Sequence, residues 1–325
     1  MRMYRCLAAI LAAVAGLLAL SPATSSAQYI GNTSFISAGL ENQRISPING
    51  VVTAPTTTFM LDGQLMLGSY GDQLYVAFSS SQSSSSRDFM PQQGIAEDNL
   101  GSIGRAAFGI APSWGNVSAK LGLTYTSISK PDASVVGMMT GNMPGAEAEL
   151  SARLSPGDSD KRAQAGYASY AFIPFVRAEM YSIPQASGAH STATYISAGL
   201  SSEMSYPMSG GLYGIGSRGG ARWFARTSGT ITHDPGAFGL DNGFVAMAAA
   251  RSGFAFGSFE IGAQYQYSSP IFGGGLGVLN YAASAAGYNG LGSGLGYGYG
   301  SSYYGSQAIR PQAAGAAGLY VAVRF

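Results

Sequence analysis

The chain has few charged residues, one cysteine and two histidines. Charged residues make up 10% of its 325 positions, whereas soluble domains average about 25%. The cysteine, Cys6, precedes an apolar stretch near the N-terminus, so the rest of the chain has neither a disulfide framework nor a thiolate metal site. His190 and His233 are far apart and neither has an acidic cluster beside it. We therefore expect no metal centre and no other cofactor.

Enzyme motifs are also missing. The sequence has no G-x-S-x-G, no H-E-x-x-H and no Walker loop. Residues 214–219 have the letters G-x-G-x-x-G, but an extended stretch follows where a dinucleotide site requires a helix. His233 with Asp234 would suit a barrel-embedded hydrolase, although Thr232 to Gly236 is better interpreted as a turn. We predict that the protein is not an enzyme, and a hydrolase using His233 is the weakest alternative.

The N-terminus predicts export. Arg2 and Arg5, an apolar run from Leu7 to Leu20 and small residues up to Ala27 indicate a cleaved signal peptide over residues 1–27. The run of 14 residues is shorter than the ~20 that span a bilayer as a helix. Without the two arginines, 15 Lys and Arg stand against 16 Asp and Glu, so we expect no nucleic-acid partner. Beyond this segment there is no apolar run of helix-spanning length, and a closed barrel is the remaining way to cross a membrane.

Alternating apolar and polar residues predict strands along residues 28–325. One hairpin joins 59–67 to 74–78 through a turn at Gly71-Asp72, with Leu67 opposite Val76. A second joins 108–110 to 117–123 through Gly115-Asn116, with Ile110 opposite Leu121. Further strands are expected near 147–154, 161–172, 175–183, 192–201 and 259–267, with a break at Pro174 and a surface loop or strand tip over the serine-rich stretch 79–86. The count is about twelve strands in one domain, within a range of ten to fourteen.

The last seven residues place apolar Leu319, Val321, Val323 and Phe325 in alternation with residues that include Arg324. This strand resembles the closing strand of Gram-negative outer-membrane β-barrel proteins. The resemblance implies an all-β, closed antiparallel transmembrane β-barrel in the outer membrane. It also implies outer-membrane lipids and the barrel-assembly machinery as partners, with the four apolar residues as the assembly signal. A soluble two-sheet sandwich would show the same periodicity, but the sparse charge and the 20 tyrosines available for interfacial girdles favour the barrel.

Charged residues on the polar faces define the expected lumen. Arg218, Arg222 and Arg226 have even spacing, so they share one face of a strand and would form a basic ladder that favours anions. In the alternative interpretation, glutamates, among them Glu179, pair with these arginines and with Arg177 and Arg251 in a structural network. Both interpretations predict the same pore-lining residues: Arg218, Arg222, Arg226, Glu147, Glu149, Arg153, Glu260 and Gln264.

The sequence therefore predicts a porin-like channel or passive transporter for small hydrophilic solutes, with anionic solutes as one option. The Gly/Tyr-rich tract 273–318 is expected to be a long external loop, or else a segment that plugs the lumen or adheres to other surfaces. An occluded barrel, or a secreted surface or matrix protein that uses this tract for adhesion, is the alternative. The oligomeric state is left open.

Overall fold

The computed structural model describes residues 34–45, 56–68, 72–85, 102–129, 141–156, 168–184, 190–208, 221–234, 243–272 and 314–324. Within them lie twelve strands, which are β1 (Phe35–Ile45), β2 (Thr56–Leu67), β3 (Asp72–Ser85), β4 (Ser102–Trp114), β5 (Val117–Ser129), β6 (Gly141–Ala152), β7 (Ser169–Pro184), β8 (His190–Pro207), β9 (Arg222–Asp234), β10 (Gly243–Phe256), β11 (Phe259–Phe272) and β12 (Ala314–Arg324). The described segments include no helix that is long and apolar enough to cross a membrane.

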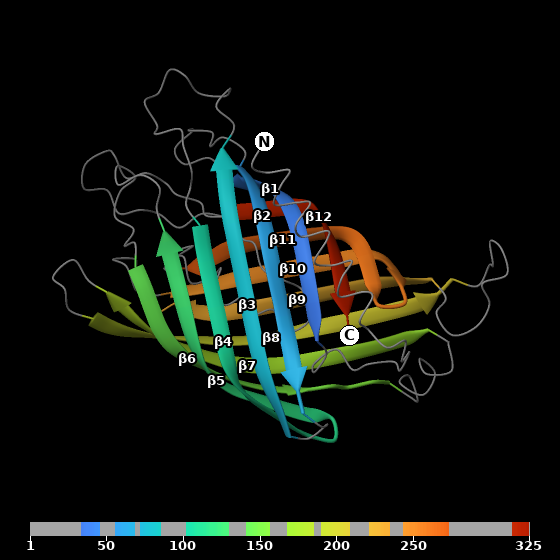
Figure 1. Cartoon of the computed structure of the whole chain (residues 1–325), viewed down its shortest axis with the longest axis horizontal. Coiled ribbons are helices and arrows are strands. Elements are labelled where there is room, and N and C mark those ends of the chain that lie inside the picture. Colours follow the sequence, from blue (N-terminus) through green and yellow to red (C-terminus); the bar gives the residue numbers. More distant parts are fainter. Residues whose placement is uncertain are drawn as a thin grey trace.

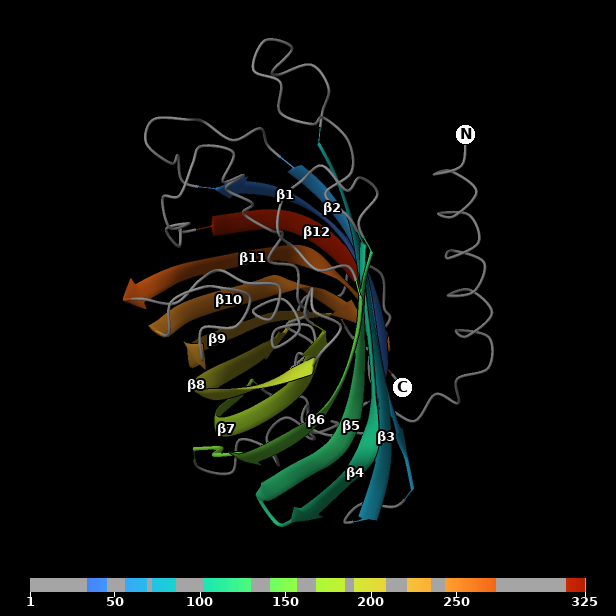
Figure 2. The same ribbon diagram turned by 90° about the vertical axis from the view of Figure 1, so that its left-hand side faces the viewer.

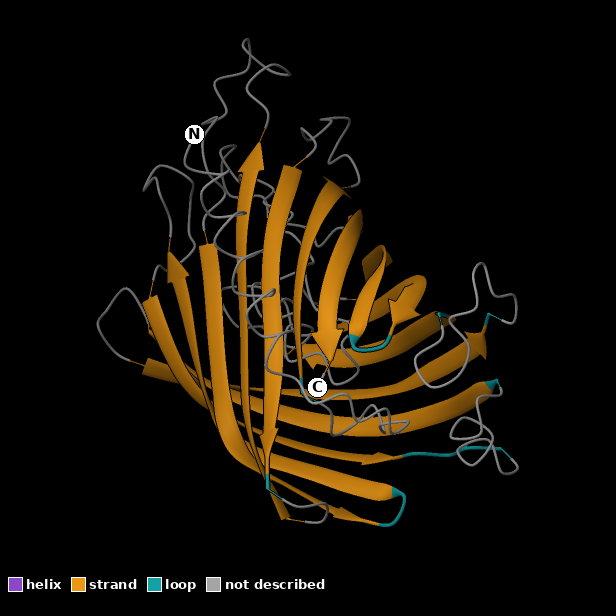
Figure 3. Ribbon diagram, turned by 45° about the vertical axis from the view of Figure 1, so that its right-hand side comes forward, coloured by secondary structure: helices purple, strands orange, loops and turns teal. Residues whose placement is uncertain are grey.

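The strands form one closed antiparallel barrel. Each pairs with its neighbours in the chain, and β1 pairs with β12 along its whole length, from Phe35 opposite Arg324 to Ile45 opposite Ala314. The near wall, with β2, β3 and β4, runs at a steep angle across β8 to β11 behind it (Figure 1), and Figure 2 shows the same two walls from the side. Such a crossing follows from the tilt of strands in a closed barrel. Figure 3 shows the wall curving round on itself. The predicted fold class and strand number are confirmed.

Side chains alternate between an inner polar face and an outer apolar face. On β5, Lys120 and Thr124 are buried inside, whereas Leu121 and Leu123 are about half exposed on the outside. On β8, Ser197 and Ser201 are buried between the exposed Ile196 and Leu200. A soluble sandwich would bury the apolar set instead, so this distribution is that of a membrane barrel.

The two predicted hairpins have different outcomes. In the second, Gly115 adopts a positive φ of 58° in the turn, and Ile110 lies opposite Leu121 as predicted. In the first, Leu67 lies opposite Leu74 and not Val76, because the connection runs from residue 68 to residue 71 and not through Gly71-Asp72 alone. The error is two residues, and a shift of two keeps every side chain on its predicted face.

Pro174 does not separate two strands, as the sequence suggested, but lies inside β7 opposite Leu200. The break is in the ladder to β6, where regular pairing stops at Ser151 opposite Phe175. Phe172 and Leu154 exchange two backbone hydrogen bonds of 2.8 Å further along. Proline has no N–H to donate at the position between them, so the interruption affects one ladder and not the strand.

Two other boundaries differ from the predictions, and one agrees with a stated alternative. β9 continues to Asp234, so Thr232 and His233 belong to a strand and not to a turn. Most of the serine-rich stretch forms the end of β3, in agreement with the strand-tip alternative. β12 begins at Ala314, so the last residues of the Gly/Tyr-rich tract are strand, while 273–313 lie outside the described residues. The predicted signal peptide over 1–27 lies outside them as well.

Candidate functional site: a lumen lined with charge

All charged residues whose side chains the structure describes belong to the inner face. They are Glu41, Asp62, Arg105, Lys120, Glu147, Glu149, Arg153, Arg177, Glu179, Glu203, Arg222, Arg226, Arg251, Glu260 and Arg324. Most are buried. The three that are only partly buried donate hydrogen bonds to side chains of the inner face: Arg153 to Glu203, Arg222 to Ser205 and Arg324 to Glu260. Seven acidic and eight basic residues nearly cancel. The outer face therefore carries no charge among these residues, and the lumen is the only candidate site that this distribution defines.

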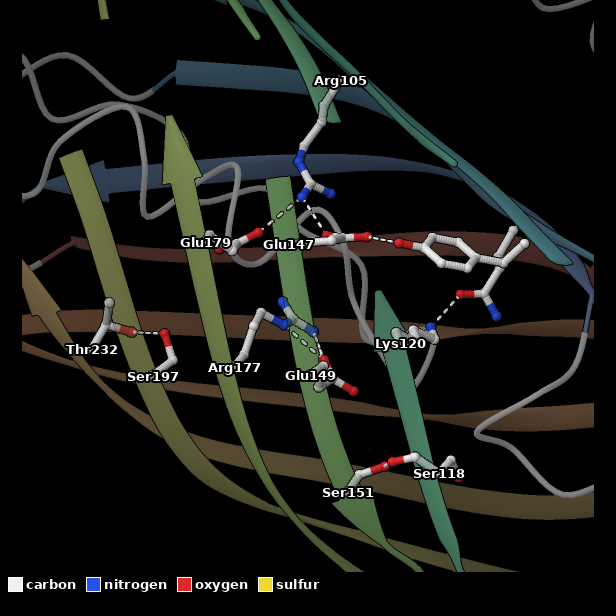
Figure 4. A network of polar contacts seen from close by, with 12 residues as sticks. Arg105, Ser118, Lys120, Glu147, Glu149, Ser151, Arg177, Glu179, Ser197 and Thr232 are labelled. Atoms are coloured by element: carbon white, nitrogen blue, oxygen red, sulfur yellow. Dashed lines mark hydrogen bonds and ion pairs between the residues drawn. The ribbon is translucent and has the colours of Figure 1, made fainter. Parts of the chain in front are cut away.

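One group of contacts, here named the central network, crosses the lumen (Figure 4). The hydroxyl of Tyr75 on β3 donates to Glu147 on β6 at 2.5 Å. Arg105 on β4 donates to Glu147 at 2.6 Å and to Glu179 on β7 at 2.9 Å. Tyr181 also donates to Glu179, at 3.3 Å. The bonds of Tyr75 and Arg105 join strands that are not neighbours in the sheet, so they extend through the lumen and not only along its wall.

Two further pairs complete the central network. Arg177 on β7 donates from Nε to Glu149 at 2.7 Å, and Lys120 on β5 donates to Gln64 on β2 at 2.6 Å. One small cavity of about 10 Å³ lies among side chains of this network, which include Tyr75. That volume is about the smallest that holds one water molecule. The side chains around this cavity therefore pack closely.

A second group, here named the arginine end, lies where the β4–β5 and β10–β11 turns are found. It consists of Arg153, Glu203, Arg222, Arg226, Glu260 and Arg324. Arg226 donates two bonds to Glu260, of 2.9 and 2.7 Å, and one of 3.0 Å to Glu203. Arg153 lies beside the β4–β5 turn, since its backbone N–H donates to Asn116 at 2.7 Å. Four arginines meet two glutamates here.

A third group lies on β1, β2, β10 and β11. Glu41 accepts hydrogen bonds from Gln264 at 2.7 Å and Gln266 at 3.1 Å. Arg251 approaches Asp62 to 4.0 Å and stacks 4.4 Å from the centre of the Tyr320 ring. Gln264 fits above Gly39, where a Cβ would meet its amide nitrogen at 3.1 Å. These contacts connect the first two strands with β10 and β11, on the other side of the β1–β12 pair that closes the barrel.

The structure distributes the predicted pore-lining residues that it describes over all three groups. Glu147 and Glu149 belong to the central network, and Arg153, Arg222, Arg226 and Glu260 belong to the arginine end. Gln264 lies in the third group, and Arg218 is outside the described residues. Arg226 pairs with Glu260 and Arg177 with Glu149, as in the ion-pair interpretation.

Sequence reasoning missed several residues of these groups. Arg105, Glu203, Glu41 and Asp62 were not singled out, and neither was the role of Lys120. The signal that would have found them is simple, since each is a charge at an inward position of an alternating strand.

The predicted assembly signal is divided between two environments. Leu319 is 70% exposed on the outer face, whereas Val323 is only 3% exposed. Val321 is partly buried, and Phe325 lies outside the described residues.

The histidines do not form a joint site. His233 lies on β9, and its ring packs against that of Phe244 with 5.3 Å between the ring centres. His190 Nδ1 lies 3.1 Å from the Ser182 hydroxyl. Among the described residues there is no group of three His, Cys, Asp or Glu that could hold a metal ion.

Comparison with solved structures agrees with the barrel fold. LpxR from Salmonella typhimurium is similar over 90% of this chain and 100% of its own, with 9% identity and a TM-score of 0.50. An outer membrane channel from Pseudomonas putida F1 is similar over 94% of this chain and 100% of its own, with 12% identity and a TM-score of 0.44. No protein-family model and no curated protein matches the chain. At 9% identity the similarity to LpxR bears on the barrel fold alone and establishes no activity.

Proposed function

We propose that the chain is an outer-membrane barrel that forms a narrow passage for small hydrophilic solutes, closed at rest by side chains and selective for anions. The observation that carries this proposal is the sorting of charge. The charged side chains that the structure describes lie on the inner face, and large apolar side chains such as Phe108 and Leu200 lie exposed on the outer face. Lipid outside and a polar lumen inside account for both sets.

The spacing of outer aromatic residues supports a membrane position. Trp114 and its partner Val117 lie beside one turn, and Tyr125 follows eight residues beyond Val117. On β11, Tyr267 likewise follows eight residues beyond Phe259. Eight residues extend ~26 Å along a strand, or ~20 Å of height at a tilt of about 40°. Aromatic girdles flank an apolar band about 25 Å tall in such barrels, so these residues suit its two borders.

The connections indicate the orientation. Two residues join β4 to β5 and two join β10 to β11, whereas 41 residues separate β11 from β12 at the opposite end. Bacterial barrels have short periplasmic turns and longer extracellular loops. The arginine end, which lies at the short turns, then faces the periplasm. Its excess of arginine over glutamate favours anions there.

Conductance in planar lipid bilayers tests the passage. We expect small, infrequent openings and a reversal potential in a KCl gradient that reports anion preference. A second candidate, an occluded barrel without transport, is favoured by the cross-lumen bonds of the central network. No conductance from the native barrel or from a variant that lacks Arg105 would select the occluded barrel. If the protein is released into the medium and does not fractionate with outer membranes, both the passage and the occluded barrel are contradicted. We propose no covalent chemistry for either.

A further inference from the structure

The two carboxylate oxygens of Glu149, on β6, have different surroundings (Figure 4). Nε and Nη2 of Arg177 both donate to Oε2. Oε1 is buried and accepts no hydrogen bond from the chain, and the Glu149 side chain is only 4% exposed. A buried carboxylate oxygen without a donor is costly because it has lost its hydration. Glu149 therefore requires a donor that its ion pair with Arg177 does not supply.

Another buried arginine–glutamate pair of the same lumen has a different geometry. Arg226 donates from Nη1 to Oε2 of Glu260 at 2.9 Å and from Nη2 to Oε1 at 2.7 Å. This is the parallel fork in which each carboxylate oxygen receives its own N–H. Arg177 instead directs two N–H groups at one oxygen, which leaves Oε1 of Glu149 for another partner.

Glu149 also lines the cavity of about 10 Å³ in the central network. Among the described residues around this cavity, Ala77 alone has no polar side chain, and Gln64, Lys120 and Arg177 supply N–H groups. Cavities that stay dry are apolar, whereas a polar one of this volume suits a single water molecule. Two carboxylates and two cationic groups line it, a balance that favours a neutral occupant over an ion.

We propose that this cavity binds one water molecule, which donates a hydrogen bond to Oε1 of Glu149 and accepts one from an N–H group of the lining. Lys120 on β5 donates to Gln64 on β2 at 2.6 Å, and an ammonium group has three N–H donors. A water between Lys120 and Glu149 joins this contact to the Arg177 pair on β6 and β7. Such a bridge is nearly as favourable in enthalpy as a direct hydrogen bond. The inference goes beyond the proposed function and holds whether or not the lumen conducts.

A crystal structure of the full-length barrel, at a resolution that shows ordered water, tests the site directly. We expect one water at about 2.7–2.8 Å from Oε1 of Glu149. A cavity without a water, or a protein donor bonded to Oε1, would overturn the inference. A water at this position in a barrel that never conducts would keep the inference and contradict the passage.

Two variants of nearly equal size test whether the occupant is polar. Ala77→Thr and Ala77→Val both fill the cavity and displace the water, but only threonine brings a hydroxyl that can donate to Glu149. We expect the threonine variant to unfold at a temperature about 2–4 °C above that of the valine variant. The control position is Ala107 on β4, which packs in an apolar cluster with Tyr75 and Ala111. There the valine variant should be at least as stable as the threonine variant.

Equal unfolding temperatures of the two Ala77 variants, or a more stable valine variant, would overturn the inference. If neither variant folds, Ala77→Ser replaces them, since its single hydroxyl is about the size of a water molecule. In a crystal structure of this variant, the serine Oγ should bond to Oε1 of Glu149 in place of the water. An Oγ that points elsewhere beside an unbonded Oε1 would count against the site.

Discussion

Arg105 binds Glu147 and Glu179 through a single nitrogen, Nη2, at 2.6 and 2.9 Å. The two glutamates lie opposite each other on β6 and β7, and Arg105 reaches them from β4. All three side chains are almost fully buried, with exposed fractions of 3%, 7% and 1%. Two neighbouring carboxylates thus share a cation that comes from a strand that pairs with neither of theirs.

Replacing Arg105 by glutamine should both weaken and open the barrel. The change leaves Glu147 and Glu179 facing each other without their shared cation, and breaking a buried pair in this way costs about 3–5 kcal/mol. It also removes a bond that crosses the lumen from β4 to β7. We expect a lower free energy of unfolding in urea and a larger single-channel conductance in bilayers.

The triple variant Arg105→Gln/Glu147→Gln/Glu179→Gln is the matched control for charge. It removes the unpaired carboxylates while keeping side chains of similar size, so it should recover much of the lost stability. Conductance should remain high because the cross-lumen bond is still absent. If Arg105→Gln shows native conductance together with reduced stability, the central network supports the fold without closing a passage.

Gly122 on β5 is predicted to be intolerant of a side chain. A Cβ at this position would lie 2.0 Å from the Tyr75 hydroxyl and 2.7 Å from the backbone oxygen of Phe108. Gly122→Ala therefore displaces Tyr75 from Glu147 and should cost about 1–3 kcal/mol of unfolding free energy. At Gly229 on β9 a Cβ would meet nothing within 4 Å, so Gly229→Ala should change stability by less than about 0.5 kcal/mol. Equal losses in the two variants would show that the Tyr75 contact is unimportant.

The sequence predicts the barrel well because alternation tolerates errors of two residues. Leu67 was matched with Val76 and lies opposite Leu74, yet both partners are on the outer face. Turn geometry was predictable where Gly115-Asn116 fixed a two-residue connection, and not where four residues join β2 to β3. Pro174 misled because a missing N–H interrupts only the ladder on one side of a strand.

The pairing inside the lumen was only partly predictable. Inward positions follow from alternation, so Glu147, Glu149 and Arg226 were correctly placed on a polar face. Which charges meet depends on how far the strands tilt and on which wall faces which. Arg105 on β4 bonds to Glu179 on β7 although β5 and β6 lie between these strands in the sheet, and no spacing along the chain encodes that contact.

A charge on the outer face should be costly at mid-height and tolerated at the border. Leu121 on β5 is 50% exposed and lies midway between Val117 and Tyr125, the residues assigned to the two borders of the apolar band. We expect Leu121→Arg to lower the free energy of unfolding by about 2–4 kcal/mol, and Val117→Arg by about 0–1 kcal/mol. Reversible urea unfolding in lipid vesicles measures both. Equal costs at the two positions would argue against a bilayer around this wall.

Closure of the barrel between β1 and β12 can be tested by cross-linking. Ala38 lies directly opposite Val321, both on the outer face, and Leu319 is two residues out of register with Ala38. Opposite residues of antiparallel strands have Cα atoms about 4.5–5.5 Å apart, within the range that a disulfide bridges, whereas diagonal neighbours are about 7–8 Å apart. In a background with Cys6 replaced, Ala38→Cys/Val321→Cys should form an intramolecular disulfide on mild oxidation. Ala38→Cys/Leu319→Cys should form it poorly. Because the cross-link joins the two ends of the strand order, efficient bridging in the first variant alone requires a sheet without free edges, and no bridging in either would mean that β1 and β12 do not pair.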